Sequence, residues 1–261
     1  MVAEDSGGLG VAWQGHVLAR LAPGRSLLEP ALRTARSLDR LSASSRAALR
    51  QRLERWLDAQ IERHLVPLKR LAAAAGDPAS TPGVRALAAM LADAGGLLAR
   101  KAMIGAISHL EHADRQALHR LRVRLGPLDV FVPALLKPAA QHWRAALVAI
   151  RSGQPMPKLP PPGAATLTSE ADPRGAALSY RRLGRGWIRI DLADRLASHA
   201  RKVRSAGGDD PVDVQLATSI GLDEQAIALL MNEIGFTRAG DACWRFRHRG
   251  RLRGLAVPTL S

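Results

Sequence analysis

A proline-rich segment limits the folds that this chain can adopt. Five prolines fall within eight positions, at 155, 157, 160, 161 and 162, and each of them fixes φ and removes a backbone N–H donor. A helix cannot run through such a stretch. We therefore expect a semi-rigid linker at residues 152–175, between a mainly helical domain at residues 1–151 and a second domain at residues 176–261 that ends in a basic tail.

Apolar residues in the first domain recur mostly at the spacing of amphipathic helices. From Ser44 to His64 they recur at three- and four-residue steps, and Pro67 should end or kink that helix. Similar steps predict further helices, one ending at the Gly95–Gly96 pair and others at residues 97–107, 114–122 and 137–150. Alternating apolar and polar residues predict two short hairpins, at residues 11–21 and 123–132. The expected fold class is mainly α with small β-hairpins.

The second domain contains the most specific local pattern, LATSIGLDEQAIALL at residues 216–230. Ala217 precedes Gly221 by four positions, and the apolar residues lie at the buried offsets of a helix-turn-helix. Glycine suits the sharp turn because it tolerates a positive φ. We expect Asp210–Pro211 to begin the first helix and Asp223 to cap the second.

The flanking sequence supplies the remaining parts of a winged helix. A strand is expected at residues 187–190, a helix at 191–203 and a hairpin, the wing, at 236–246. The exposed front of the second helix of the pair carries Asp223 and Glu224, which phosphates would repel. We therefore expect that helix to pack or to contact protein, rather than to recognise a DNA sequence.

Charge is the first indication of function, because Lys and Arg number 38 against 23 Asp and Glu, a formal net charge of +15. Such a surplus attracts polyanions, above all nucleic acid, and 33 of the 38 cations are Arg, whose planar fork suits phosphate. A merely solvated surface, produced by GC-rich coding, is the alternative.

Five arginines from 245 to 253 occupy every second position, so an extended chain would project them to one side, along a phosphate backbone. A disordered basic tail is the alternative there.

The candidate site consists of cations around the second domain and two aromatic residues. The residues expected to neutralise phosphates are Arg181, Arg182, Arg185, Arg245, Arg247, Arg249, Arg251 and Arg253. The candidates for base stacking are Tyr180 and Trp187.

Catalytic and metal-binding motifs are missing from the sequence. There is no GxxxxGK[ST], GxSxG, GxGxxG or HExxH pattern, and three histidines at 109, 112 and 119 lack zinc-site spacing and should face solvent. A single cysteine, Cys243, excludes an internal disulfide. No catalytic residue, metal or cofactor is expected. No apolar stretch approaches the roughly 20 residues that cross a bilayer, and the acidic start favours a cytoplasmic location.

Residues 125–150, LGPLDVFVPALLKPAAQHWRAALVAI, resemble the region that follows the motor core in alphaproteobacterial superfamily-two DExH helicases of the mitochondrial degradosome type. VAWQGHVLARLAPG at residues 11–24 and RLERWLDAQIERHLVPLKRL at residues 52–71 are similar to parts of the same region, as are the strand and helix from Trp187 onward and the closing hairpin. The resemblance covers residues 11–249. It implies an accessory region that packs on two RecA-like motor domains and completes a channel for a single strand.

None of the motor motifs of those helicases occurs in this chain. ATP and Mg²⁺ would accordingly belong to motor domains present in cis or in trans, and no activity is expected of this chain alone. The implied function is binding of RNA or DNA, in single-stranded form, together with docking to the motor. Two alternatives remain open, a free-standing winged-helix regulator of duplex DNA and a scaffold for an acidic protein partner.

Overall fold

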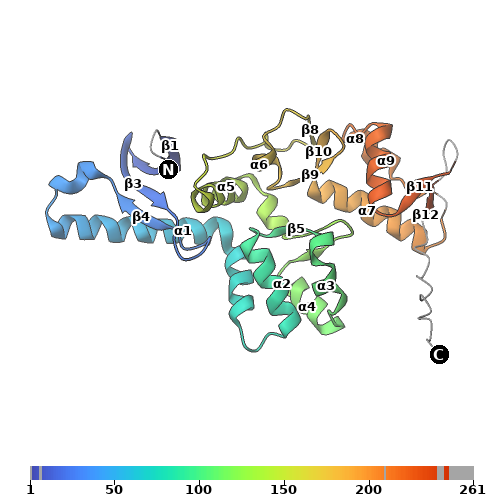
Figure 1. Ribbon diagram of the computed structural model, residues 1–261, viewed down its shortest axis with the longest axis horizontal. Coiled ribbons are helices and arrows are strands. Elements are labelled where there is room, and N and C mark those ends of the chain that lie inside the picture. The colour runs from blue at the N-terminus through green and yellow to red at the C-terminus, as the bar shows by residue number, and fades with distance from the viewer. Residues whose placement is uncertain (1, 6–7, 209, 240–243, 247–261) are drawn as a thin grey trace, which may run out of the picture. The chain divides into compact units, whose positions relative to one another are not determined.

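The computed structural model describes residues 2–5, 8–208, 210–239 and 244–246. The chain forms two compact units, residues 1–194 and 195–261, with the boundary inside helix α7 (Ile190–Ser205). Helices predominate and are accompanied by small antiparallel sheets (Figure 1). The predicted fold class is confirmed at this level.

The first unit begins with a four-stranded antiparallel sheet. Its strands, in spatial as well as chain order, are β1 (Val2–Asp5), β2 (Gly8–Trp13), β3 (His16–Ala22) and β4 (Ala31–Thr34). The hairpin predicted at residues 11–21 is confirmed as β2–β3. Gln14 and Gly15 turn it with φ of 47° and 82°, as a two-residue hairpin loop with two positive φ angles requires. The pairing of β1 and β4 with this hairpin was not predicted.

Helix α1 (Ala43–Gly76) carries the core of the first unit. It follows a short 3₁₀ helix, η1 (Arg36–Arg40), and is capped by Ser42, whose Oγ accepts from the Ser45 N–H at 3.2 Å. The predicted kink is confirmed, because Leu65 has non-helical φ and ψ of −123° and 21°. Pro67 causes it by removing a helix donor and crowding the carbonyl four residues earlier. The buried face of α1 comprises Leu53, Leu57, Ile61, Leu65, Leu68 and Leu71.

A second layer of short elements packs against the C-terminal half of α1. These elements are α2 (Pro82–Asp93), β5 (Leu97–Ala99), η2 (Arg100–Met103), α3 (Ile104–Ser108), α4 (His112–Arg120), β6 (Arg124–Leu125) and β7 (Asp129–Phe131). The hairpin predicted at residues 123–132 is confirmed as β6–β7. The helix predicted at residues 97–107 is wrong in its first part, since Leu97–Ala99 pair with β7 as a strand. Three apolar residues fit a strand as well as a helix, and pairing with the central strand β7 decides between them.

The proline-rich segment lies inside the first unit. It follows η3 (Pro133–Leu136) and α5 (Pro138–Ser152) and leads to β8 (Thr166–Leu167) and α6 (Pro173–Ala176). Its two ends are joined, because the Lys158 N–H donates to Asp172 Oδ2 at 2.9 Å and the Arg174 guanidinium donates to the Pro155 carbonyl at 3.1 Å. Prolines prevent helix and strand at residues 153–165, yet this stretch packs as a folded loop.

A three-stranded sheet closes the first unit. It has the order β8-β10-β9, with β9 at Tyr180–Leu183 and β10 at Gly186–Arg189. Strand β10 lies where residues 187–190 predicted a strand, and α7 follows it where residues 191–203 predicted a helix.

The second unit contains the C-terminal part of α7, then α8 (Val214–Ser219), α9 (Glu224–Glu233) and the hairpin of β11 (Phe236–Arg238) and β12 (Trp244–Phe246). The predicted turn and cap are confirmed, since Gly221 has φ of 74° and Asp223 Oδ1 accepts from the Ala226 N–H at 2.6 Å. The predicted start at Asp210–Pro211 is wrong. Asp213 caps α8 instead, accepting from the Leu216 N–H at 2.9 Å, whereas Asp210 accepts from the Val212 N–H in a turn.

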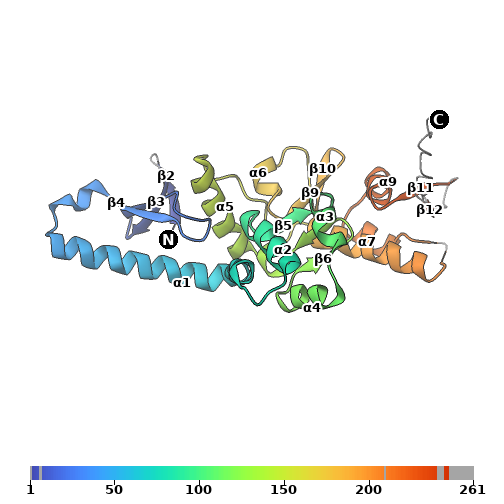
Figure 2. The same cartoon turned by 60° about the horizontal axis from the view of Figure 1, so that its bottom comes forward.

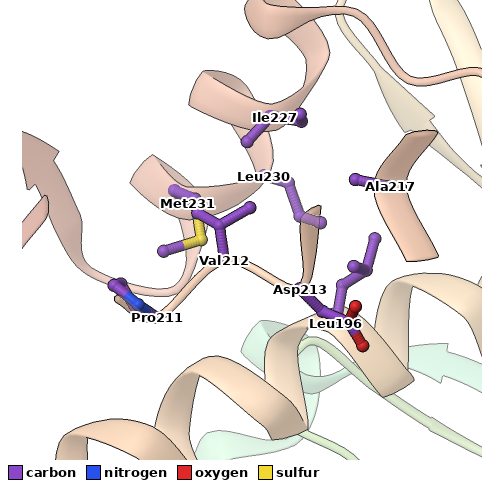
Figure 3. A pocket seen from close by; sticks show the side chains of 8 residues that line it. All are labelled: Leu196, Pro211, Val212, Asp213, Ala217, Ile227, Leu230 and Met231. Atoms are coloured by element: carbon purple, nitrogen blue, oxygen red, sulfur yellow. The ribbon is translucent and has the colours of Figure 1, made fainter. Parts of the chain in front are cut away.

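The helices of the second unit meet around a small space. Figure 3 shows Leu196 of α7, Ala217 of α8 and Leu230 of α9 converging on it. Its volume is about 10 Å³, which is close to the minimum that one water molecule needs. We therefore regard it as a packing seam between helices rather than a ligand site.

Candidate nucleic-acid interface

Arg181 is engaged inside the protein rather than offered to a ligand. Its Nη1 donates to Asp129 Oδ2 at 2.5 Å, and the two side chains are only 17% and 7% exposed. The ion pair joins β9 to β7. Arg181 is therefore removed from the predicted set of phosphate-binding residues, because its charge is already met by a buried carboxylate.

The two residues predicted to stack on bases are buried. Tyr180 is 4% exposed and its hydroxyl donates to the Ala164 carbonyl at 2.7 Å. Trp187 is 9% exposed, and the Arg182 guanidinium lies 5.3 Å from the centroid of its ring. Neither ring offers a free face, so the base-stacking prediction is corrected for both. The alternation of residues along these strands did not show which face of the sheet the rest of the protein would cover.

The other predicted cations have different surroundings. Arg182 and Arg185 are exposed in the first unit, and Arg245 is exposed on β12 of the second. Arg182 also donates from Nε to the Gly184 carbonyl at 3.2 Å. Four of the predicted arginines lie outside the described residues, namely Arg247, Arg249, Arg251 and Arg253.

A cationic hollow that sequence reasoning missed lies beside α4. It is an open depression of about 400 Å³ lined by Arg115, Gln116, His119 and Arg120. Helix α4 runs along the surface of the first unit in Figure 1 and in Figure 2. All four residues are exposed, and none of the carboxylates in the described part of the chain lines the hollow. Within the described ranges, neither of its two arginines forms an ion pair.

The acidic residue of α4 is turned away from this hollow. Asp114 is 7% exposed, its Oδ1 accepts from the Thr81 hydroxyl at 2.6 Å, and its Oδ2 accepts from the Glu111 N–H at 3.0 Å. The Asp114 carboxylate thus ties the start of α4 to the start of α2. The next residue, Arg115, begins the exposed cationic face.

A further cation lies near Arg115. The pKa of the Arg100 guanidinium is lowered, first by its partial burial and second by the positive charge of Arg115. Arg100 Nη1 donates to the Gly126 carbonyl at 2.9 Å, and Arg115 Nη2 donates to the Ile107 carbonyl at 3.3 Å. Neutral carbonyls hold both groups, so their like charges remain available to an anion. The signal in the sequence was the four-residue spacing of Arg115 and His119, which places both on one helix face.

The Asp114 contacts predict a specific pH dependence of stability. These hydrogen bonds lower the pKa of Asp114, with the Thr81 hydroxyl the largest cause. A lowered folded-state pKa means that the stabilisation is complete above the unfolded value of about 3.9 and is lost as the pH falls through the folded value. Asp114→Asn should therefore be less stable than the parent protein at neutral pH, with the difference shrinking below about pH 4.

Urea unfolding followed by circular dichroism at several pH values measures this difference. The exposed Asp93, at the end of α2, provides the matched control, because Asp93→Asn removes a carboxylate without breaking a cap. A constant difference between Asp114→Asn and the parent protein across the acid range would contradict the assignment.

The described residues were also searched for metal-binding groups and for helices that could cross a membrane. No group of three or more His, Cys, Asp or Glu side chains that could hold a metal ion occurs among them. The predicted exposure of His109, His112 and His119 is confirmed. None of the helices in the described part of the chain combines the length and the apolar character needed to cross a bilayer.

Comparisons with protein-family models, with curated proteins and with solved structures gave no match to this chain.

Proposed function

We propose that this protein binds nucleic acid through its phosphates, without strong sequence preference. The observation that carries the proposal is the hollow beside α4, which gathers Arg115, His119 and Arg120 and is lined by no carboxylate of the described residues. Arg100 adds a fourth basic side chain close to Arg115. A cluster of like charges without counter-charges attracts a polyanion, and the net charge of +15 brings one to the surface.

A role as an accessory region of an ATP-dependent helicase is part of the same proposal. It is supported by the resemblance of residues 11–249 to the C-terminal region of DExH helicases. In that role the chain would dock on motor domains in cis or in trans and guide a single strand of RNA or DNA. ATP and Mg²⁺ would be held by the motor.

The second unit is proposed to be a winged helix that contacts protein. Three helices followed by a hairpin, α7, α8, α9 and β11–β12, have the order that this fold requires. The exposed start of α9 carries Asp223 and Glu224, and Glu224 accepts from Arg238 at 3.4 Å. An acidic helix front disfavours insertion into a DNA groove, which argues against a duplex-specific regulator.

The test of phosphate binding is a variant that removes the two arginines of the hollow. Arg115→Ala with Arg120→Ala should weaken binding of single strands and duplexes alike by about tenfold, and flatten the dependence of log K on log salt. Each lost phosphate contact lowers that slope by about 0.7 for single strands and about 0.9 for duplexes. Fluorescence anisotropy with labelled oligonucleotides, repeated at several salt concentrations, measures both quantities.

The matched control removes the same charge from α1. Arg46 is partly buried and Arg50 is exposed, and they lie 3.7 Å from Asp39 and 2.8 Å from Glu54. Arg46→Ala with Arg50→Ala should leave the salt slope within error of the parent protein. Equal losses in both double variants would mean that net charge alone, and not the hollow, accounts for binding. A parent protein that binds no oligonucleotide even at low salt would refute the proposed function.

A further inference from the structure

Helix α4 ends in a Schellman motif whose left-handed position holds an arginine. The Arg122 N–H donates to the His119 carbonyl at 2.9 Å, and the Val123 N–H donates to the Leu118 carbonyl at 2.9 Å. Leu118 and Val123 are both buried in the core, which is the apolar contact that accompanies this motif. The residue after the helix cap must then adopt a positive φ, and Arg122 does so with φ of 60°.

Other helices of the described chain end near a glycine in the same backbone conformation. Positive φ angles occur at Gly95 after α2, Gly153 after α5, Gly207 after α7, Gly221 after α8 and Gly235 after α9. Glycine has no Cβ and adopts this conformation without strain, whereas an arginine there is strained. Arginine is therefore an unfavourable choice for the fold at the end of α4, and strained residues of this kind gather at functional sites.

The charge of the helix end does not account for Arg122. Cations in the last turn of a helix interact favourably with its negative end, which carries about half an elementary charge. His119 and Arg120 already occupy that turn of α4, and the charge of Arg120 alone exceeds this amount. Arg122 is exposed, and its guanidinium forms no ion pair within the described part of the chain. Its charge therefore remains for a ligand.

Arg122 lies next to the cationic hollow in the chain. It follows Arg120, a residue that lines the hollow, by two positions, so their Cα atoms are at most about 7 Å apart. Arg115, Arg120 and Arg122 thus gather three guanidinium groups within residues 115–122. No ion pair with a described residue engages any of the three. The surplus of positive charge is concentrated at one end of a short helix rather than spread along a path.

A phosphate monoester fits this concentration of charge better than the internal phosphates of a strand. Each internal phosphodiester carries a single negative charge, whereas a monoester carries about 1.5 to 2 negative charges at pH 7 and three strong acceptor oxygens. Guanidinium groups bind such oxygens through paired, charge-assisted hydrogen bonds. Three neighbouring arginines therefore favour the phosphorylated end of a strand over its interior.

We propose that Arg122, together with Arg115 and Arg120, forms a receptor for the terminal phosphate monoester of a nucleic-acid strand. The inference deepens the proposed function, on which it rests, because it names the chemical group that the hollow selects. Arg122 stays at a strained position because its guanidinium completes the receptor. The ligand is a strand end rather than a free phosphate, since the net charge of +15 attracts the rest of the strand as well.

The experiment compares strands that differ only in a terminal phosphate. The probes are single strands of roughly 16 nucleotides, labelled on an internal base, with a 5′-phosphate, a 3′-phosphate or hydroxyl groups at both ends. Anisotropy titration of the full-length parent protein should show about tenfold tighter binding of one phosphorylated strand than of the hydroxyl-ended strand, the effect of one charge-assisted hydrogen bond. A preference for either phosphorylated end supports the proposal.

Arg122→Gly should reduce this advantage to about twofold or less and leave the affinity for the hydroxyl-ended strand nearly unchanged. Because glycine relieves the strain, the melting temperature should equal that of the parent protein or exceed it by up to about 3 °C. Arg122→Lys keeps the charge without the planar fork and should retain part of the advantage. Arg151 is exposed in the last turn of α5, and the matched control Arg151→Ala should retain all of it.

Failure of the inference differs from failure of the proposed function. If the parent protein binds the three strands equally well, the receptor is refuted and phosphate binding by the hollow remains. An undiminished advantage in Arg122→Gly, or a clearly lower melting temperature, excludes Arg122 from the receptor. If orthophosphate at the concentration of the strand abolishes the advantage, the ligand is a free phosphate and the strand-end assignment is wrong. If the parent protein binds no probe at low salt, the proposed function fails and the inference fails with it.

Discussion

Replacing Arg144 by alanine should destabilise the first unit by about 3–5 kcal/mol. Arg144 lies in α5, is 1% exposed, and is the largest fully buried side chain of the described residues. Its Nη1 donates to the Leu135 carbonyl at 3.1 Å and to the Leu178 carbonyl at 2.9 Å. One guanidinium thus joins the end of η3 to the approach of β9. Alanine would leave a cavity and remove the donor that both carbonyls share.

Burial lowers the pKa of Arg144 to about 10, and no carboxylate of the described residues pairs with it, so the side chain still carries its charge at neutral pH. Keeping that charge in the interior costs free energy. Two variants can therefore separate the contribution of the charge from the contribution of packing. Arg144→Leu removes the charge while filling much of the space, and should destabilise the protein less than Arg144→Ala. The exposed Arg151 of the same helix provides the control, because Arg151→Ala should change stability by less than about 0.5 kcal/mol. Urea unfolding measures the stability of all three variants. A loss below about 1 kcal/mol for Arg144→Ala would contradict the role of Arg144 in joining η3 to the approach of β9.

Asp129→Ala should cost about 3 kcal/mol, because it leaves Arg181 without its carboxylate in a mostly buried position. The pair lies between β7 and β9, and Asp129 itself is 5% exposed. Breaking a buried pair by removing one partner is far more costly than replacing both partners by apolar residues. The double variant Asp129→Leu with Arg181→Met should therefore regain much of the lost stability. A double-mutant cycle by urea unfolding gives the coupling free energy between the two positions.

The exposed pair of Arg50 and Glu54, 2.8 Å apart on α1, is the matched control. Glu54→Ala should change stability by less than about 1 kcal/mol, because solvent screens surface pairs. The same variants also test the position of Arg181 in the proposed function. Arg181→Ala should lower stability and leave the salt slope of oligonucleotide binding unchanged, whereas an unchanged stability with a shallower slope would return Arg181 to the interface.

Local sequence patterns were sufficient to predict those turns, kinks and caps that one or two residues determine by themselves. The hairpin at Gln14–Gly15, the kink at Pro67 and the cap at Asp223 depend on one or two residues and are confirmed. The strand at Leu97–Ala99 was missed because its partner residues lie 30 to 34 positions further along the chain. Asp210 and Asp213 are equivalent as caps in sequence, and only the packing of α8 distinguishes them.

The candidate site was less predictable than the fold because exposure, and not residue type, decides which cation or ring can meet a ligand. Tyr180 and Trp187 have the right chemistry but are buried, whereas Trp13 has the same chemistry and is exposed. Arg181 and Arg115 look alike in sequence, yet a buried carboxylate meets only the first of them within the described chain. Pairings between distant residues determine these differences, and a single sequence does not display them.

Helix α1 continues through its kink, and its buried face runs from the sheet at one end to the α2 layer at the other. An insertion of one residue within it would rotate one end against the other by about 100° and shift it by about 1.5 Å. The loop at residues 77–81 absorbs length changes without such a rotation. Evolutionary insertions and deletions should accordingly gather in that loop and spare the helix, because the number of residues in α1 sets the distance between the sheet and the α2 layer.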